Sequence, residues 1–345
     1  MLKISLLNPA DIAKAKQWDE YVLNCPAGTF FHRSAWQEII RDVFRHKTYF
    51  LLAEDETGIR GVLPLAHVHS RLFGNALVAL PFGVYGGVAA SDAEALSILE
   101  NEAQQLARQL GVDHLEFRNL RQHHPDWPTQ ELYVTFRKEI LPDVEDNLLA
   151  IPRKQRAMVR KGIKNGLEST VDRNTDRFFA LYADNVHRHG TPAFPKRYFE
   201  TLHRVFGTDC EVLTVTGPDG QPLSSVMSFY FRDEVLPYYA GDDERARNLA
   251  ANDFKYWELM RLACGRGLKV FDFGRSKHGT GSFSFKKNWG FEPQPLHYEY
   301  CLYKRDSIPQ NNPSNAKYRI FIEAWRRMPI GLANWLGPHI VRNLG

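Results

Sequence analysis

The most chemically suggestive part of the chain is the segment 268–291, in which a β-prone run ends at glycines and is followed by cations. The apolar run at 268–273 predicts a buried strand. Asp272 interrupts it, and a buried carboxylate is unfavourable unless a cation or a hydrogen-bond donor meets it. We expect that partner among the four cations that follow, which are Arg275, Lys277, Lys286 and Lys287.

Glycines give the same segment an open backbone. Gly274, Gly279 and Gly281 permit positive φ and the close approach of a ligand. The loop is therefore suited to a group that is negatively charged or carries a carbonyl. A structural Asp–Arg pair beneath a glycine-rich turn is the alternative interpretation, because such pairs combine the same residue types.

A second candidate is a basic helix predicted at 147–164. Arg153, Arg156, Arg160 and Lys164 are spaced so that they share one helical face, and no acidic residue occurs between the first and the last of them. Like charges on one face repel, so an anion that spans them would stabilise the helix. Pyrophosphate, a nucleic-acid backbone and anionic lipid headgroups all qualify, and a solvated charged helix is the alternative.

Composition limits the other possibilities. With 345 residues the chain is long enough for two domains, and its net charge of +4 means that anion binding must come from local clusters. The four cysteines form no Cys-x-x-Cys, and the histidines have no ligand at a familiar spacing, so we expect neither a disulfide scaffold nor a metal site. Hydrolase, Walker and Rossmann motifs are absent from the sequence. Without a visible secretory signal, the expected location is cytoplasmic, with peripheral contact at the inner face of the membrane as an option.

One order of elements occurs twice along the chain. The first half predicts helices at 11–23 and 34–43, strands at 49–54, 61–68 and 77–84, a helix at 92–110 and a strand at 112–118. The second half predicts a helix at 194–206, strands at 210–216, 223–231 and 236–241, a helix at 250–265 and a strand at 268–274. The pattern predicts an α+β fold of two duplicated units, with chance similarity of two mixed domains as the alternative.

The last segment, 304–345, mixes apolar and aromatic side chains with arginines. This mixture suits a membrane interface. It also suits docking on the protein's own surface, which we favour because a tryptophan-rich apolar helix is more often buried.

Residues 285–290, Phe-Lys-Lys-Asn-Trp-Gly, resemble the Phe-Lys-x-x-aromatic-Gly element of the Fem family of non-ribosomal peptidyl (aminoacyl) transferases. More narrowly, segments 153–156, 189–192, 271–277 and 286–291 resemble the FemAB proteins associated with PEP-CTERM/exosortase systems. The likeness covers nearly the whole chain. It implies tandem GNAT-like domains, which we place at 1–140 and 141–303, followed by a helical tail at 304–345.

The resemblance also implies a function, the transfer of an acyl or aminoacyl group to an amine or hydroxyl of a cell-envelope or exopolysaccharide-related acceptor. Acyl-CoA or aminoacyl-tRNA would be the donor, and no cofactor would be firmly bound. Lys286 matches the family's motif lysine and would stabilise the oxyanion, while Asp272 would orient or deprotonate the acceptor. The residues expected to contact substrate are Arg153, Arg156, Arg160, His189, Tyr239, Arg275, Lys277, Lys287 and Trp289.

The chain departs from the related patterns in two ways. Arg247, Asn248 and Asn252 stand where acetyl-CoA enzymes have a glycine-rich pyrophosphate loop, and they are the candidates for donor binding. No inserted helical hairpin corresponds to the arm of some Fem enzymes. Two alternatives to a transferase stay open. One is a non-catalytic module that binds a lipid-linked saccharide, and the other is RNA binding, including tRNA, through the basic helix alone.

Overall fold

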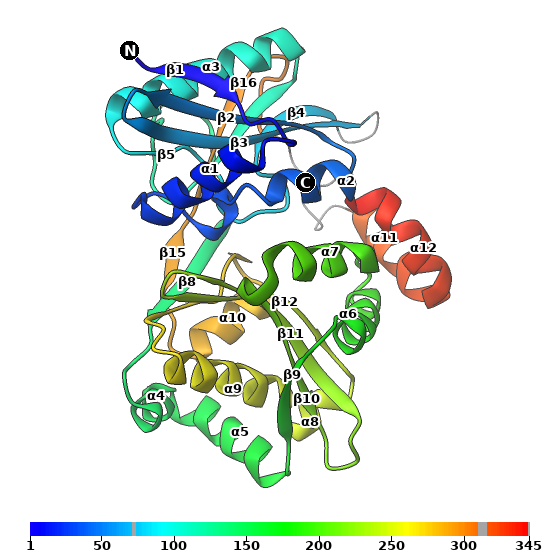
Figure 1. The fold of residues 1–345 in the computed structure, drawn as a ribbon. Helices are drawn as coiled ribbons and strands as arrows, with labels where there is room; N and C mark the ends of the chain where they lie inside the picture. The colour runs from blue at the N-terminus through cyan, green and yellow to red at the C-terminus, as the bar shows by residue number, and fades with distance from the viewer. Residues whose placement is uncertain (71–73, 310–315, 344–345) are drawn as a thin grey trace. The chain divides into compact units, whose positions relative to one another are not determined.

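A computed structural model describes residues 1–70, 74–309 and 316–343 (Figure 1). The chain forms two compact units. Unit 1 comprises Met1–Leu132, Pro295–Gln310 and Arg342–Gly345, and unit 2 comprises Tyr133–Gln294 and Asn311–Val341. This division differs from the predicted boundaries at 140 and 303, because a strand near each boundary belongs to the sheet of the other half.

Unit 1 is built on one mixed sheet. Its strands follow the order β1 (Lys3–Leu6), β2 (Lys47–Asp55), β3 (Gly58–Ser70), β4 (Gly74–Ala79), β6 (His114–Asn119), β16 (His297–Leu302) and β7 (Thr129–Gln130), with β5 (Ala89–Ala90) paired to β3. Its helices are α1 (Ile12–Asn24), α2 (Trp36–Asp42) and α3 (Ala93–Leu110), with a 3-10 turn η1 at Phe30–His32. β4 and β6 run parallel, and β6 and β16 run antiparallel.

Unit 2 repeats this arrangement. Its strands follow the order β9 (Glu168–Asp172), β10 (Cys210–Thr216), β11 (Pro222–Phe231), β12 (Glu234–Asp242), β13 (Val270–Asp272), β8 (Tyr133–Glu139) and β14 (Ser276–Lys277), with β15 (Pro293–Pro295) paired to β8. Its helices are α4 (Val144–Ala150), α5 (Arg153–Lys164), α6 (Asp176–Arg188), α7 (Lys196–Phe206), α8 (Ala246–Leu249), α9 (Ala251–Gly265), α10 (Gly281–Asn288), α11 (Ala316–Arg327) and α12 (Ile330–Val341), with a 3-10 turn η2 at Gly207–Asp209. β12 and β13 run parallel, and β13 and β8 run antiparallel.

The predicted duplication is confirmed, and the two units also exchange a strand. Strand β8 follows β7 of unit 1 in sequence, yet it pairs with β13 of unit 2. Strand β16 follows the body of unit 2, yet it pairs with β6 of unit 1. In each sheet, the strand next to the parallel pair therefore comes from the part of the sequence that forms the other half.

The long helices occur where the sequence predicts them, because their end signals are strong. Asp92 caps α3 by accepting a hydrogen bond from the Ala95 N–H at 2.9 Å, and Gly111 ends the helix with a φ of 61°. The buried hydrophobic positions recur every fourth residue, at Ala95, Leu99, Ala103 and Ala107. This stripe faces the core of unit 1.

The single basic helix predicted at 147–164 is wrong in one respect, because two helices, α4 and α5, occupy that segment. Pro152 separates them, since proline has no N–H and favours an extended conformation in the residue before it. Ile151 is extended accordingly, with φ −70° and ψ 131°. α5 packs on α9 through Gly162, where an added Cβ would lie 2.8 Å from the Phe254 Cβ atom.

The tail docks on unit 2, as favoured from the sequence. α11 and α12 (red in Figure 1) lie beside α6. A 2.9 Å hydrogen bond joins His187 Nε2 to the Met328 carbonyl, and Gly190 lies so close to Ile322 that a Cβ would be 2.5 Å from its Cγ2 atom. Yet Ile320 and Trp335 are 74% and 65% exposed. Among the described residues, no helix has the length and apolar character needed to cross a membrane.

Candidate active site

Asp272, at the end of β13, is completely buried and lies at the centre of a polar cluster. Its Oδ2 accepts a 2.7 Å hydrogen bond from Arg137, and its Oδ1 accepts from the Thr135 hydroxyl at 3.2 Å and from the Gly274 N–H at 2.8 Å. Arg137 also pairs with Glu234. The carboxylate forms an ion pair with Arg137, which comes from β8 and was not among the predicted partners, and it also acts electrostatically on Lys286, which was.

Lys286, on α10, binds the backbone that follows Asp272. Its Nζ donates to the carbonyls of Phe273, Gly274 and Arg275 at 2.7, 3.0 and 3.1 Å. Its side chain lies in the interior, since the residue is 8% exposed. Burial lowers the pKa of Lys286 to about 7, the Asp272 carboxylate opposes that shift and the Arg275 guanidinium adds to it. The ammonium has three N–H donors, so all three are engaged.

Together, Asp272 and Lys286 hold one turn of backbone, one as a hydrogen-bond acceptor and the other as a donor. Asp272 accepts from the N–H of Gly274, and Lys286 donates to the carbonyls around it. Gly274 has a φ of 65°, which only glycine adopts without strain. The turn leads to α10, whose first residues are capped by the Thr280 hydroxyl. A rigid turn with an ammonium of near-neutral pKa is therefore held at the end of a parallel strand.

The parallel strands at this point are in register over a short distance only. Glu234 pairs with Val270 and Val235 with Phe271, while β12 continues to Asp242. Tyr239 lies on this continuing part of β12, and its hydroxyl is 2.9 Å from that of Tyr198. Burial raises the pKa of Tyr239 well above its ordinary value, so the phenol stays protonated and can donate a hydrogen bond.

The other predicted residues of the loop and of α10 have different surroundings. Arg275 is exposed and its guanidinium stacks over the Tyr133 ring at 4.6 Å. Lys277 is half-buried in β14, and Lys287 is exposed with its Nζ 5.9 Å from the Phe283 ring. Trp289 is completely buried and donates to Asp253 at 2.9 Å. Because its N–H is already bonded, Trp289 could contact substrate only through the face of its indole ring, and this contact stays a prediction.

The predicted anion-binding residues lie on other elements of unit 2. Arg153 and Arg160 are exposed on α5, and Arg156 is half-buried and donates to the Leu149 carbonyl at 2.9 Å. Within the described residues, no cation of α5 has an ion-pair partner. The predicted anion face is therefore present and unneutralised, and what it binds stays a prediction.

The predicted donor-binding residues and His189 stand apart from Asp272 in the chain. Arg247 and Asn248 are exposed on the short helix α8, and Asn252 is in the first turn of α9. Ala250 joins the two helices with a φ of 61°. His189 is exposed at the end of α6, with its Nδ1 2.7 Å from the Asn185 carbonyl, and Gly190 beside it packs against α11. The tail therefore packs against the residue next to His189, which we expected to contact substrate.

Comparison with known proteins identifies the fold. Residues 153–287 match a family model described as an acetyltransferase (GNAT) domain, and no curated protein matches the sequence. FemX is 14% identical, with a TM-score of 0.65 over 88% of this chain and 98% of FemX. L-PGS from Bacillus licheniformis is 12% identical, with a TM-score of 0.58 over 92% of this chain and 98% of that chain.

A tandem GNAT protein from the clavulanic acid biosynthesis pathway is 12% identical, with a TM-score of 0.53 over 89% of this chain and all of that chain. The protein has a tandem GNAT fold. The predicted fold class is thus confirmed. Identities of this size establish the GNAT architecture and leave the acceptor and the donor open.

Sequence reasoning missed the residues of this GNAT site that come from distant segments. Thr135 and Arg137 were assigned to the first domain, although the isolated Asp272 did signal that a cation was needed. Lys255 of α9 was also missed, although it is completely buried and donates to Asp242 at 2.9 Å. No periodicity signal identifies Lys255, because α9 buries side chains on most of its circumference.

Proposed function

We propose that unit 2 of this tandem GNAT protein transfers an acyl or aminoacyl group from a carrier to an amine or hydroxyl acceptor. The observation that carries the proposal is Lys286, a buried ammonium with a pKa of about 7 that grips the turn after β13. A lysine in this state can stabilise negative charge without the shielding of bulk water. The fold supports the proposal, because the GNAT model covers β9 to α10 and the adjoining α5.

In the proposed reaction, the acceptor nitrogen or oxygen attacks the carbonyl carbon of an ester or thioester. The carbonyl oxygen becomes an oxyanion, the bond to the carrier oxygen or sulfur breaks, and the acceptor's proton ends on the carrier. Lys286 would stabilise the oxyanion after one of its three carbonyls yields to the substrate oxygen. Asp272 has both oxygens engaged, so we assign it the positioning of the turn rather than proton removal.

For the donor we propose aminoacyl-tRNA or acyl-CoA, whose phosphates would lie against α5. Arg153, Arg156 and Arg160 provide fixed positive charge there, and Arg247, Asn248 and Asn252 near the start of α9 would contact the donor as well. His189, Tyr239, Arg275, Lys277, Lys287 and Trp289 remain the proposed substrate contacts.

For the acceptor we propose a cell-envelope or exopolysaccharide-related amine or hydroxyl, on the strength of the segments that resemble PEP-CTERM-associated FemAB proteins. A lipid-linked acceptor would require the protein to work at the cytoplasmic face of the membrane. The exposed Ile320 and Trp335 of the tail support such a peripheral contact.

A transfer assay tests the proposal. The purified protein is incubated with charged tRNAs or with acyl-CoA thioesters, together with amino-sugar and polyprenyl-linked saccharide acceptors, and products are followed by mass spectrometry. We expect one donor class to yield a product, and Lys286→Met to remove it. Lys269→Met is the control, because Lys269 is an exposed lysine of unit 2 to which we assign no role in binding or catalysis.

Full transfer by a folded Lys286→Met protein would contradict the role of that lysine. Tight binding of polyprenyl-linked saccharide with no transfer from any donor would replace the proposal with the non-catalytic module. Binding of RNA alone, strongly weakened by salt, would favour the third alternative.

A further inference from the structure

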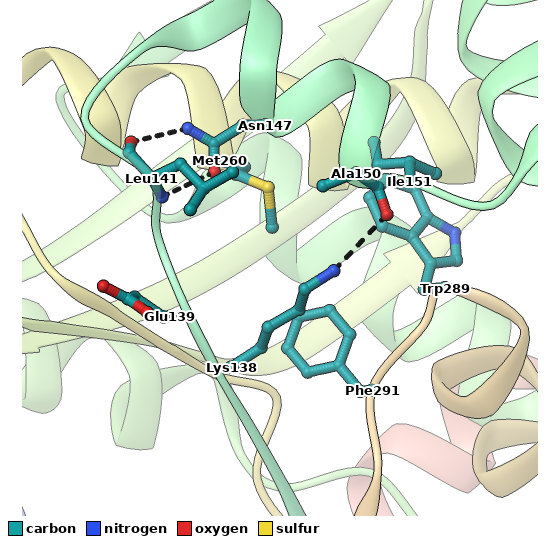
Figure 2. A pocket seen from close by; sticks show the side chains of 9 residues that line it. All are labelled: Lys138, Glu139, Leu141, Asn147, Ala150, Ile151, Met260, Trp289 and Phe291. Carbon is teal, nitrogen blue, oxygen red and sulfur yellow. Dashed lines mark hydrogen bonds between the residues drawn. The ribbon is translucent and has the colours of Figure 1, made fainter.

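A pocket of about 340 Å³ opens in unit 2 between β8, the α4–α5 junction, α9 and the segment after α10 (Figure 2). Its volume is within the range of small-molecule sites. It is lined by Lys138, Glu139, Leu141, Asn147, Ala150, Ile151, Met260, Trp289 and Phe291. None of the catalytic residues proposed above lines it, and of the proposed substrate contacts only Trp289 does.

The pocket holds one ammonium, that of Lys138. Figure 2 shows this side chain crossing the pocket with its Nζ directed at the Ala150 carbonyl, at 3.5 Å. Such a contact is at the long limit of a hydrogen bond. The Phe291 ring lies 5.7 Å from the Nζ, which adds a cation–π contact. Burial lowers the pKa of Lys138, as expected for an ammonium that loses water and gains no paired carboxylate.

No carboxylate of the described residues pairs with Lys138. Glu139 is its neighbour in the chain and also lines the pocket, but in Figure 2 its carboxylate is directed away from the ammonium. Lys138 has three N–H donors, and the Ala150 carbonyl occupies one of them. Two donors are therefore left for a ligand.

The remaining wall of the pocket is largely hydrocarbon and aromatic. Met260, Trp289 and Phe291 are almost completely buried, and Leu141 is half-buried beside them. Asn147 presents no free amide there, because its side chain bonds both the N–H and the carbonyl of Leu141. A ligand would thus meet one cation and a largely apolar surface, with the Glu139 carboxylate directed away from the ammonium.

We propose that this pocket binds an amphiphilic monocarboxylate with a hydrocarbon chain of about eight carbons, its carboxylate on Lys138 and its chain against Leu141, Met260 and Phe291. A single ammonium matches a single negative charge, and a second phosphate charge would meet no further cation among the lining residues. The proposal does not depend on the transfer reaction, because it uses a different part of unit 2.

The alternative role for Lys138 is purely structural. Its ammonium, which comes from β8, lies at the C-terminal end of α4, where cations bind the carbonyls of the last helical turn. That role needs neither an empty volume beside the ammonium nor apolar walls around it. The two roles predict different outcomes for one substitution.

Isothermal titration calorimetry with sodium octanoate tests the proposal. We expect wild-type protein to bind octanoate, and Lys138→Met to weaken binding at least about tenfold, which corresponds to about 1.4 kcal/mol. Lys138→Arg should retain most of the affinity because it keeps the charge. Lys154→Met, which removes an exposed lysine of α5, is the matched control and should bind as wild type does.

Two further arms complete the test. Octanol and octyltrimethylammonium should bind at least about tenfold more weakly than octanoate, because neither offers a negative charge. Leu141→Trp should block the pocket from its half-buried rim, and it covers the case in which Lys138→Met unfolds. The proposal is overturned if wild-type protein does not bind octanoate, or if folded Lys138→Met or Leu141→Trp binds it as tightly as wild type.

Discussion

The two units treat the end of their parallel strand pair differently. In unit 1, Arg118 of β6 is buried, pairs with Glu116 at 2.7 Å and donates to the carbonyls of Leu80 and Gly83 at 3.3 and 2.8 Å. The loop after β4 is thereby folded onto the strand ends. Gly87 of that loop has no room for a side chain, since an added Cβ would lie 1.7 Å from the Asn119 Oδ1 atom.

In unit 2, the corresponding buried pair is Asp272 with Arg137, and it joins two strands. The turn that follows Asp272 donates the Gly274 N–H to the carboxylate. The ammonium of Lys286, from α10, binds the carbonyls of the same turn. We infer that duplication left one copy with a closed, structural strand end and the other with a strand end that holds a reactive amine.

The largest expected effect concerns Lys286. Lys286→Met should lower kcat by at least about 100-fold, because the oxyanion loses its cation. Steady-state transfer kinetics measure this, with Lys269→Met, at an exposed lysine with no assigned role, as the control. If Lys286 acts as the charged form, kcat of the wild type should fall as pH rises above about 7. A rate that rises there would show that the neutral amine is the active form.

The comparison of buried Arg118 with half-buried Arg137 comes next. Arg118→Met should lower the free energy of unfolding by about 3 to 5 kcal/mol, because Glu116 would be left buried without its cation. Arg137→Met should have a similar effect on stability and also lower kcat, since Asp272 positions the turn. Denaturant titration and kinetics on folded protein separate the two effects. Equal loss of kcat in both variants would contradict the division of roles between the units.

The pH dependence of stability sharpens the same comparison. The pKa of Lys286 is lowered on folding, so between about pH 7 and its ordinary pKa the unfolded chain binds more protons than the folded chain. The free energy of unfolding of wild type, relative to Lys286→Met, should therefore increase from pH 7 to pH 9. Urea titration at several pH values measures the difference, and a flat difference would mean that the lysine stays charged in the fold.

The smallest effect is expected for the tail. Trp335→Ala should reduce sedimentation with phosphatidylglycerol vesicles several-fold, because a 65% exposed tryptophan in a tail that also carries the exposed Arg326 and Arg327 suits an anionic interface. Val171→Ala, an exposed apolar residue on β9, is the control. Unchanged sedimentation of the Trp335→Ala protein would remove the membrane role of the tail.

Sequence patterns predicted the elements well and their partners poorly. The N-cap at Asp92, the stop at Gly111 and the apolar stripe between them are local signals, so α3 was placed correctly. The partner of Asp272 comes from 135 residues earlier in the chain, and no local pattern contains that distance. The break at Pro152 was readable, because proline rarely continues a helix, but the basic periodicity concealed it.

The sequence also did not predict which charged side chains are buried. Lys286 and Lys255 were identified as charged positions, but nothing in their spacing reveals that three carbonyls surround the first or that Asp242 neutralises the second. The volume beside Lys138 also depends on residues from four separate elements.

The exchange of β8 and β16 affects how the chain can be made. The sheet of unit 1 includes residues 297–302. The ribosome must therefore synthesise most of unit 2 before the first sheet can be completed. A fragment that begins at residue 141 would lack Arg137, leaving Asp272 without its cation. A single cut between the two halves would therefore leave each sheet without one of its strands.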